Sequence, residues 1–272
     1  MGEPFFINKV VLITGGTKGF GKAAAFAFAT RGACVYITHK WGSVDEAKLM
    51  QEFADAQAVP PRIIQSDVAD PDANRELIEL IMQEKSKIDV LISNVSFAKV
   101  VGGLDDWKRQ ALEISIKNSA WPVVELLRLC QHIIGKYPRY VIAVSSNGPD
   151  VCYPGYGMVG STKALVETMC RYLAVYLKEA GVRVNVIRPG FLRTESSMAT
   201  FGEELLDELA QRMPAIFLDP HAVAKSCLAL CSGWMDSVTG QVITVDEGST
   251  LVGPISYATG VGLPKCFPVE AE

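Results

Sequence analysis

Short apolar runs alternate with helix-forming stretches along most of the chain. The first run, Val10–Ile13, is followed by a glycine-rich turn that extends to Gly21 and then by the helix-forming stretch Lys22–Phe26. This alternation predicts an α/β fold with a doubly wound parallel sheet, in a single domain without internal repeats or a linker. The later strands are expected at Ala33–Thr38, Arg62–Gln65, Ile88–Ser93, Tyr140–Ser145, Arg183–Ile187 and Gln241–Val245.

The turn after the first strand has the spacing of a phosphate-binding loop. Its glycines follow the pattern Gly-x-x-x-Gly-x-Gly, one residue wider than the common dinucleotide fingerprint. Glycines let a ligand approach the backbone, and the following helix start offers free N–H groups and the positive end of its dipole to a phosphate. Turn chemistry alone would also explain these glycines. The residues expected to contact a cofactor here are Gly15, Thr17, Lys18, Gly19, Phe20 and Gly21.

The end of the second predicted strand indicates which dinucleotide would bind. In dinucleotide folds an acidic residue at this point accepts a hydrogen bond from the 2′-hydroxyl of the adenosine ribose. The chain has His39 and Lys40 instead, and Lys18 lies in the glycine loop. Positive groups attract a 2′-phosphate, so these residues favour NADPH over NADH. The alternative is that the lysines are ordinary solvated surface charges.

Composition excludes several other classes of protein. The 272 residues have a net charge of −4, which gives no indication of nucleic-acid or anionic-membrane binding. No apolar run approaches the roughly 20 residues of a membrane span, and the N-terminus has no signal-peptide pattern. The seven cysteines are scattered without a Cys-x-x-Cys pair, so we expect no metal site and reduced thiols in a cytoplasmic protein.

From about Lys9 to Leu251, the chain resembles the short-chain dehydrogenase/reductase family. The residues that support this are the glycine loop Thr14–Gly21 and the chemical centre described below. The resemblance implies that Asp67 and Val68 contact the adenine and that Asn94 packs on the adenosine side. It also implies that Pro189, Gly190 and Thr194 border the nicotinamide. The stretch Asn94–Ala98 departs from the usual Asn-Asn-Ala-Gly motif and looks like the enoyl-acyl carrier protein (ACP) reductases, as does Ser115 in place of a helix asparagine.

The chemical centre departs from the usual family pattern in an informative way. Most members have a tyrosine four residues before the lysine, but Val159 occupies that position before Lys163. Valine cannot donate a proton, which excludes carbonyl reduction in its usual form. Tyr156 precedes Lys163 by seven residues, about two helical turns, so the two side chains can share one face. This spacing matches the enoyl-ACP reductase branch.

Two further residues complete the predicted centre. Ser146 stands where carbonyl-reducing members have their serine and where many enoyl reductases have a second tyrosine. Tyr153 is a candidate for that missing phenol, or else it lines the cavity. Aromatic side chains near a helix start are more often packing residues, so a packing role without catalytic function stays open for Tyr153.

These residues suggest a reaction as a hypothesis. NADPH would reduce the double bond of an α,β-unsaturated thioester, Tyr156 would stabilise the charge on the thioester oxygen, and Lys163 would hold the nicotinamide ribose and favour ionisation of the phenol. The alternatives are a ketoreductase with a displaced tyrosine and an inactive nucleotide-sensing protein. By resemblance, residues 195–214 would form a substrate lid, the acyl group could be carried by ACP, and the protein would be a homotetramer or homodimer. The tail Val252–Glu272 lies outside the resemblance.

Overall fold

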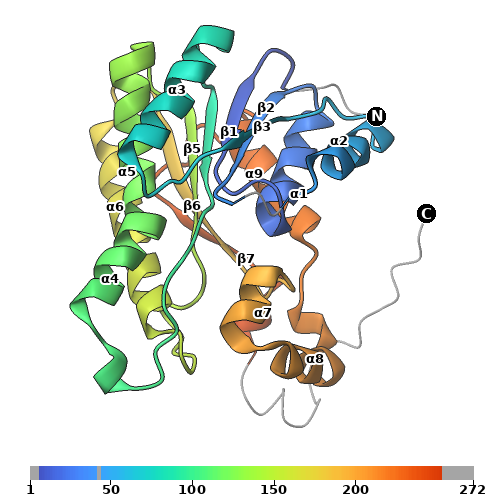
Figure 1. The fold of residues 1–272 in the computed structure, drawn as a ribbon, viewed down its shortest axis with the longest axis vertical. Helices are drawn as coiled ribbons and strands as arrows, with labels where there is room; N and C mark the ends of the chain where they lie inside the picture. The colour runs from blue at the N-terminus through green and yellow to red at the C-terminus, as the bar shows by residue number, and fades with distance from the viewer. Residues whose placement is uncertain (1–5, 42–43, 253–272) are drawn as a thin grey trace.

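One parallel sheet forms the centre of the molecule (Figure 1). The computed structural model describes residues 6–41 and 44–252, and within these residues seven strands follow the order β3-β2-β1-β4-β5-β6-β7. The neighbouring strands pair in parallel throughout. The strands are β1 (Val10–Ile13), β2 (Cys34–His39), β3 (Arg62–Gln65), β4 (Val90–Ser93), β5 (Tyr140–Val144), β6 (Arg183–Pro189) and β7 (Val242–Val245). The predicted doubly wound sheet is confirmed.

Helices cover both faces of the sheet (Figure 1). Buried side chains of α1, α2 and α9 pack on one face, and those of α3, α5 and α6 pack on the other. The α-helices are α1 (Gly19–Ala29), α2 (Glu46–Asp55), α3 (Pro71–Lys85), α4 (Arg109–Ser115), α5 (Trp121–Leu129), α6 (Gly157–Tyr176), α7 (Glu195–Phe201), α8 (Glu203–Arg212) and α9 (Pro220–Cys231). Two π-helical turns, η2 (Ile116–Ala120) and η3 (Cys130–Ile134), adjoin α5. Short 3₁₀ turns lie at η1 (Leu104–Asp106), η4 (Pro214–Ile216) and η5 (Ser249–Leu251).

Two strands continue past their predicted ends because of strand pairing, whereas β5 ends one residue before its predicted end, at Val144. β2 extends by one residue, since His39 pairs with Gln65 of β3. β6 continues past Ile187, since Pro189 pairs with Val245 of β7. His39 therefore belongs to the sheet itself, at the end where a dinucleotide binds in such folds.

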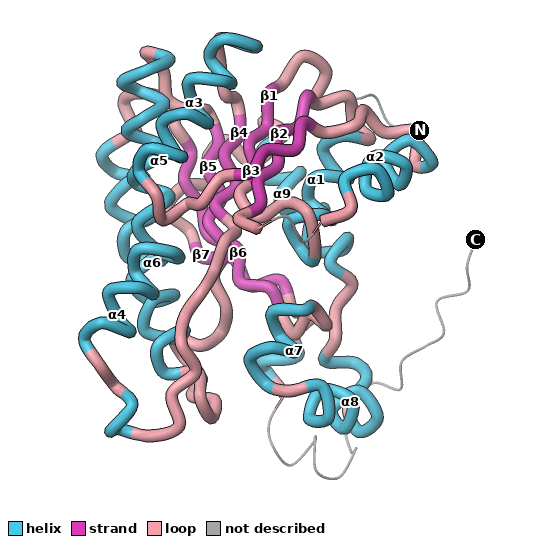
Figure 2. Tube along the Cα trace, in the orientation of Figure 1, coloured by secondary structure: helices cyan, strands magenta, loops and turns pink. Residues whose placement is uncertain are grey.

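The loops that follow the strands gather at one end of the sheet. The strand order reverses between β1 and β4, and ligands of open α/β sheets bind beyond the carboxyl ends of the strands at such a point. Figure 2 shows β6 running towards α7, with α8 beside it, while α4 and its preceding loop lie on the opposite side of that end. The predicted lid region therefore lies at the end of the sheet where the site is expected, and the tail from 253 onward lies outside the described residues.

Candidate functional site

The glycine loop has the backbone shape and the space that a phosphate needs. Gly15 and Gly19 have φ values of +65° and +55°, which L-residues with side chains rarely adopt. A Cβ on Gly21 would lie 2.2 Å from the Gly15 carbonyl oxygen, so only glycine fits this position. No side chain caps the first turn of α1, which leaves its N–H groups available to an anion. The loop therefore fits the pyrophosphate of a dinucleotide.

Asn94 and Phe20 have structural contacts at the glycine loop. The Asn94 amide donates hydrogen bonds of 3.0 Å to the carbonyl oxygens of Thr14 and Gly15, so it holds the glycine loop against the end of β4. The Phe20 ring is buried in the hydrophobic core between α1 and the sheet. The expected cofactor contacts of both residues stay predictions, and for Phe20 the backbone N–H at the start of α1 is the group that can make one.

The residues that we expect beside the adenosine part of the cofactor form pairs with one another. Lys40 Nζ lies 2.8 Å from Asp67 Oδ2 and 4.9 Å from the centroid of the Trp41 ring. Burial raises the pKa of Asp67, but hydrogen bonds from Lys40 and from the Ala69 N–H outweigh burial and hold this pKa below its usual value. His39 is buried, and Nδ1 lies 2.9 Å from the Trp41 carbonyl oxygen. Among the described residues, His39 Nε2 has no hydrogen-bond partner.

The remaining predicted cofactor residues lie around the same end of the sheet. Thr17 and Val68 are buried. Thr194 caps α7, accepting a 3.2 Å hydrogen bond from the Ser197 N–H, and its methyl group lies beside Gly19. Lys18 forms an ion pair with Glu195 of α7. A Cβ on Gly190, next to Pro189, would lie 2.4 Å from Leu218 Cδ1.

The structure brings Tyr156 and Ser146 together. The Ser146 side chain acts to lower the pKa of Tyr156, and Ser146 Oγ accepts a 3.2 Å hydrogen bond from the Gly148 N–H. The Tyr156 ring lies directly over Gly148, where an added Cβ would be 2.6 Å from Tyr156 Cε1. Gly160 of α6 packs against the backbone of Gly148. The two glycines thus allow the Tyr156 ring to pack closely on the loop that carries Ser146.

The pKa of Tyr156 lies above its usual value. Burial raises this pKa, the Ser146 side chain acts to lower it, and the charge of Tyr153 raises it. The expected role of Lys163 in favouring ionisation of the phenol stays a prediction. Tyr156 precedes the first residue of α6 instead of lying within the helix, and Lys163 Nζ donates a 2.7 Å hydrogen bond to the Val144 carbonyl oxygen at the end of β5.

A buried ion pair lies next to Lys163, and the sequence analysis missed it. Glu167, one turn further along α6, receives two hydrogen bonds from the Arg188 guanidinium at 2.6 and 2.7 Å, and a third from Ser145 Oγ at 2.7 Å. The side chains of Glu167 and Arg188 are 3% and 13% exposed. Burial lowers the pKa of Lys163 to about 8, and the charge of Glu167 acts to raise it. The signal for this ion pair in the sequence was Arg188, an arginine at the end of an otherwise apolar strand.

Tyr153 lies beside this centre. Its hydroxyl accepts a 2.6 Å hydrogen bond from the Asn147 amide, and its ring meets the Tyr156 ring edge-on at 5.9 Å between centroids. Asn147 was not singled out from the sequence. Tyr153 therefore has both a polar contact and a packing contact, and both sequence interpretations of this residue stay predictions.

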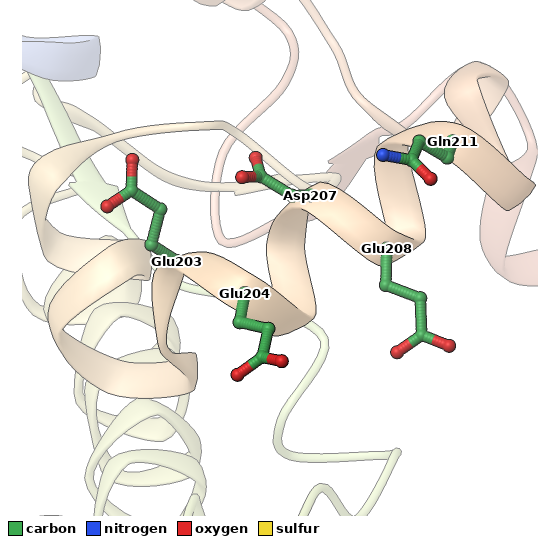
Figure 3. Close-up of a pocket in the computed structure, with 5 residues that line it drawn as sticks. All are labelled: Glu203, Glu204, Asp207, Glu208 and Gln211. Atoms are coloured by element: carbon green, nitrogen blue, oxygen red, sulfur yellow. The ribbon is translucent and has the colours of Figure 1, made fainter.

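A 670 Å³ hollow on α8 does not belong to this centre (Figure 3). Its lining residues are Glu203, Glu204, Asp207, Glu208 and Gln211. Four carboxylates repel the phosphates of a dinucleotide, so we assign the cofactor to the glycine loop. In the ranges 6–41 and 44–252, there is no group of three or more metal-binding side chains, and no helix is long and apolar enough to cross a bilayer.

Comparisons with known proteins agree with this arrangement. The model of a family described as "Enoyl-(Acyl carrier protein) reductase" matches residues 15–250. Oxidoreductase UcpA of Escherichia coli (strain K12) is 30% identical over 260 residues, covering 92% of this chain and 97% of that protein. The 1-cyclohexenylcarbonyl-CoA reductase of Streptomyces collinus is 26% identical over 258 residues, covering 92% and 90%. The crystal structure of the enoyl-[acyl-carrier-protein] reductase (NADH) from Aquifex aeolicus VF5 has the same fold, with a TM-score of 0.80 at 22% identity over 92% of this chain and 99% of that one.

Proposed function

The chain belongs to the short-chain dehydrogenase/reductase family of oxidoreductases, and from that premise we propose that it uses NADPH to reduce the C2=C3 double bond of an enoyl thioester. The observation that supports this most is the packing of the Tyr156 ring on Gly148, in the loop that carries Ser146, together with Val159 at the family's usual tyrosine position. In the loop between β5 and α6, the phenols available to a substrate are thus Tyr156 and Tyr153. The description of the matching family model points to the same reaction.

Each residue of the centre has a proposed task. NADPH, when bound, supplies the hydride. Tyr156 donates a hydrogen bond to the thioester oxygen, where negative charge builds during reduction. Loss of one such donor costs about 3–4 kcal/mol in other enzymes. Because burial raises the pKa of Tyr156, the phenol keeps its proton at neutral pH and can donate it.

Ser146 and Lys163 support that phenol and the cofactor. Ser146 orients the Tyr156 hydroxyl, whose pKa the serine side chain acts to lower. Lys163 holds the nicotinamide ribose, and to do so its ammonium group exchanges the Val144 carbonyl oxygen for ribose hydroxyls. Tyr153, fixed by Asn147, lines the acyl side of the centre. Helices α7 and α8 act as the substrate lid.

Preference for NADPH over NADH is part of the proposal. The buried Nε2 of His39 and the ammonium groups of Lys40 and Lys18 would meet a 2′-phosphate. Both lysines already pair with carboxylates, so a phosphate has to replace Asp67 and Glu195 as their partner. The Aquifex aeolicus enzyme is described as using NADH, so the affinities for NADPH and NADH need direct comparison. A tighter affinity for NADH would refute this part.

Self-association is proposed from the outer face of α6. Tyr172, Val175 and Tyr176 are 59%, 70% and 72% exposed, an apolar surface that a second copy of the chain would cover. A homodimer or homotetramer is expected, and the sedimentation coefficient of the purified protein measures it.

One pair of substrates tests the reaction. We expect NADPH oxidation with a crotonyl thioester and none with an acetoacetyl thioester. Tyr156→Phe should lower the rate with crotonyl thioester by about two to three orders of magnitude. Oxidation with the acetoacetyl thioester alone would favour the second candidate, a ketoreductase, for which the serine at position 146 is the supporting observation. Cofactor binding without turnover of either substrate would indicate a nucleotide-sensing protein.

A further inference from the structure

Aromatic rings from separate segments meet next to Tyr156. The Phe201 ring, at the end of α7, lies nearly parallel to the Tyr156 ring, with an interplanar angle of 18° and 5.5 Å between centroids. The Tyr153 ring meets Phe201 edge-on at 6.1 Å, and Phe191, which follows β6, lies 6.1 Å from Phe201. Phe217 extends the group through an edge-on contact of 6.2 Å with Phe191. We call these five residues the aromatic cluster.

The position of Phe201 depends on these ring contacts. None of the residues of α7 is buried, so the hydrophobic core does not fix the helix. At its other end, α7 is attached by the Thr194 cap and by the exposed ion pair between Lys18 and Glu195. Exposed ion pairs contribute little to stability. Phe201 can therefore leave the Tyr156 ring without disrupting the fold.

The ring of Phe201 lies where the acyl group of a substrate has to lie. If the Tyr156 hydroxyl bonds the thioester oxygen, the carbons attached to that carbonyl must run alongside the Tyr156 ring. A flat group that enters between these two rings would have the face of Tyr156 on one side and the face of the displaced Phe201 ring on the other. Stacked and edge-on ring contacts contribute beyond the burial of apolar area, and a straight alkyl chain offers no ring face for them.

We propose that Phe201 is a specificity-determining residue, and that the aromatic cluster selects a short acyl group that contains a ring over a straight chain of equal carbon number. The inference rests on the proposed function, because it uses the position of the thioester oxygen at Tyr156. The reductase of Streptomyces collinus, named for a cyclohexenylcarbonyl thioester, shows that a relative of this chain acts on a ring-bearing acyl group.

Binding of two unreactive thioesters tests the proposal without turnover. Benzoyl-CoA and heptanoyl-CoA have the same number of acyl carbons, and neither has an enoyl double bond. Their dissociation constants are measured by titration calorimetry on the full chain, with NADP⁺ and then NAD⁺ present. We expect benzoyl-CoA to bind about 3- to 10-fold more tightly. Apolar transfer alone would favour the longer alkyl chain.

Variants of Phe201 identify the cause of the preference. Phe201→Leu should abolish it, and Phe201→Tyr, which keeps the ring, should retain it. Trp234→Leu, which removes an exposed ring in the segment after α9, is the control and should leave it unchanged. Equal or tighter binding of heptanoyl-CoA, no binding of either thioester, or an unchanged preference in Phe201→Leu would each overturn the proposal. A benzoyl preference in a protein that does not reduce crotonyl thioester would refute the proposed reaction and support the selectivity.

Discussion

Replacement of Glu167 by glutamine tests how the buried ion pair supports the centre. Glutamine keeps the size of the side chain and can still accept a hydrogen bond from Ser145. It removes the negative charge that faces Arg188 at 2.6 and 2.7 Å, in surroundings where both side chains are largely excluded from water. Removal of one partner of a buried pair costs about 3–5 kcal/mol, because the other charge stays buried. Since Asp150 still contacts Arg188, we expect a loss near the lower end, about 3 kcal/mol.

The measurement is the free energy of unfolding from urea denaturation, with the m-value checked for change. Glu208→Gln is the matched control. It breaks a 2.6 Å pair with Arg212 whose side chains are 51% and 74% exposed, and such pairs contribute about 0.5 kcal/mol or less. Arg188→Met in the Glu167→Gln background should recover part of the loss, because it removes the unpaired cation. Equal losses in Glu167→Gln and Glu208→Gln would refute the reasoning.

The remaining predictions concern Lys163 and Gly148. Burial lowers the pKa of Lys163 from 10.5 to about 8, so the unfolded chain binds more protons between these two values. The free energy of unfolding should therefore rise by up to about 3 kcal/mol as the pH increases from 8 to 10.5, and Lys163→Met should lack this rise in urea titrations at each pH. Gly148→Ala would place a Cβ 2.6 Å from the Tyr156 ring, so the rate with crotonyl thioester should fall about tenfold or more, as for other displaced catalytic groups. Gly103→Ala, where nothing lies within 4 Å, is the control and should keep the wild-type rate.

Features that depend on local sequence were predicted well. The glycine loop and the parallel sheet follow from short-range patterns, and the structure has both. These features need only the order of residues near each strand end, because the sheet brings the strand ends together.

Features that depend on contacts across the fold could not be predicted. Lys40 and Asp67 were assigned to different parts of the cofactor, but they follow neighbouring strands and pair with each other. Sequence spacing gives no indication that Glu167 would receive Arg188 from β6, or that Phe201 would lie on Tyr156. Such pairings depend on how the helices sit on the sheet, which a pattern of apolar and polar positions leaves undetermined.

The acidic surface of α8 has a kinetic consequence for any anionic carrier. Its four carboxylates lie on one short helix beside α7. Arg193 pairs with Asp207 and Arg212 with Glu208, so Glu203 and Glu204 are the two that have no ion pair among the described residues. A negatively charged carrier that approaches over α8 is repelled before contact, and at 0.1 M salt this repulsion extends about 10 Å. Added salt would screen it and accelerate association, the reverse of the salt dependence expected for an enzyme that attracts its carrier electrostatically.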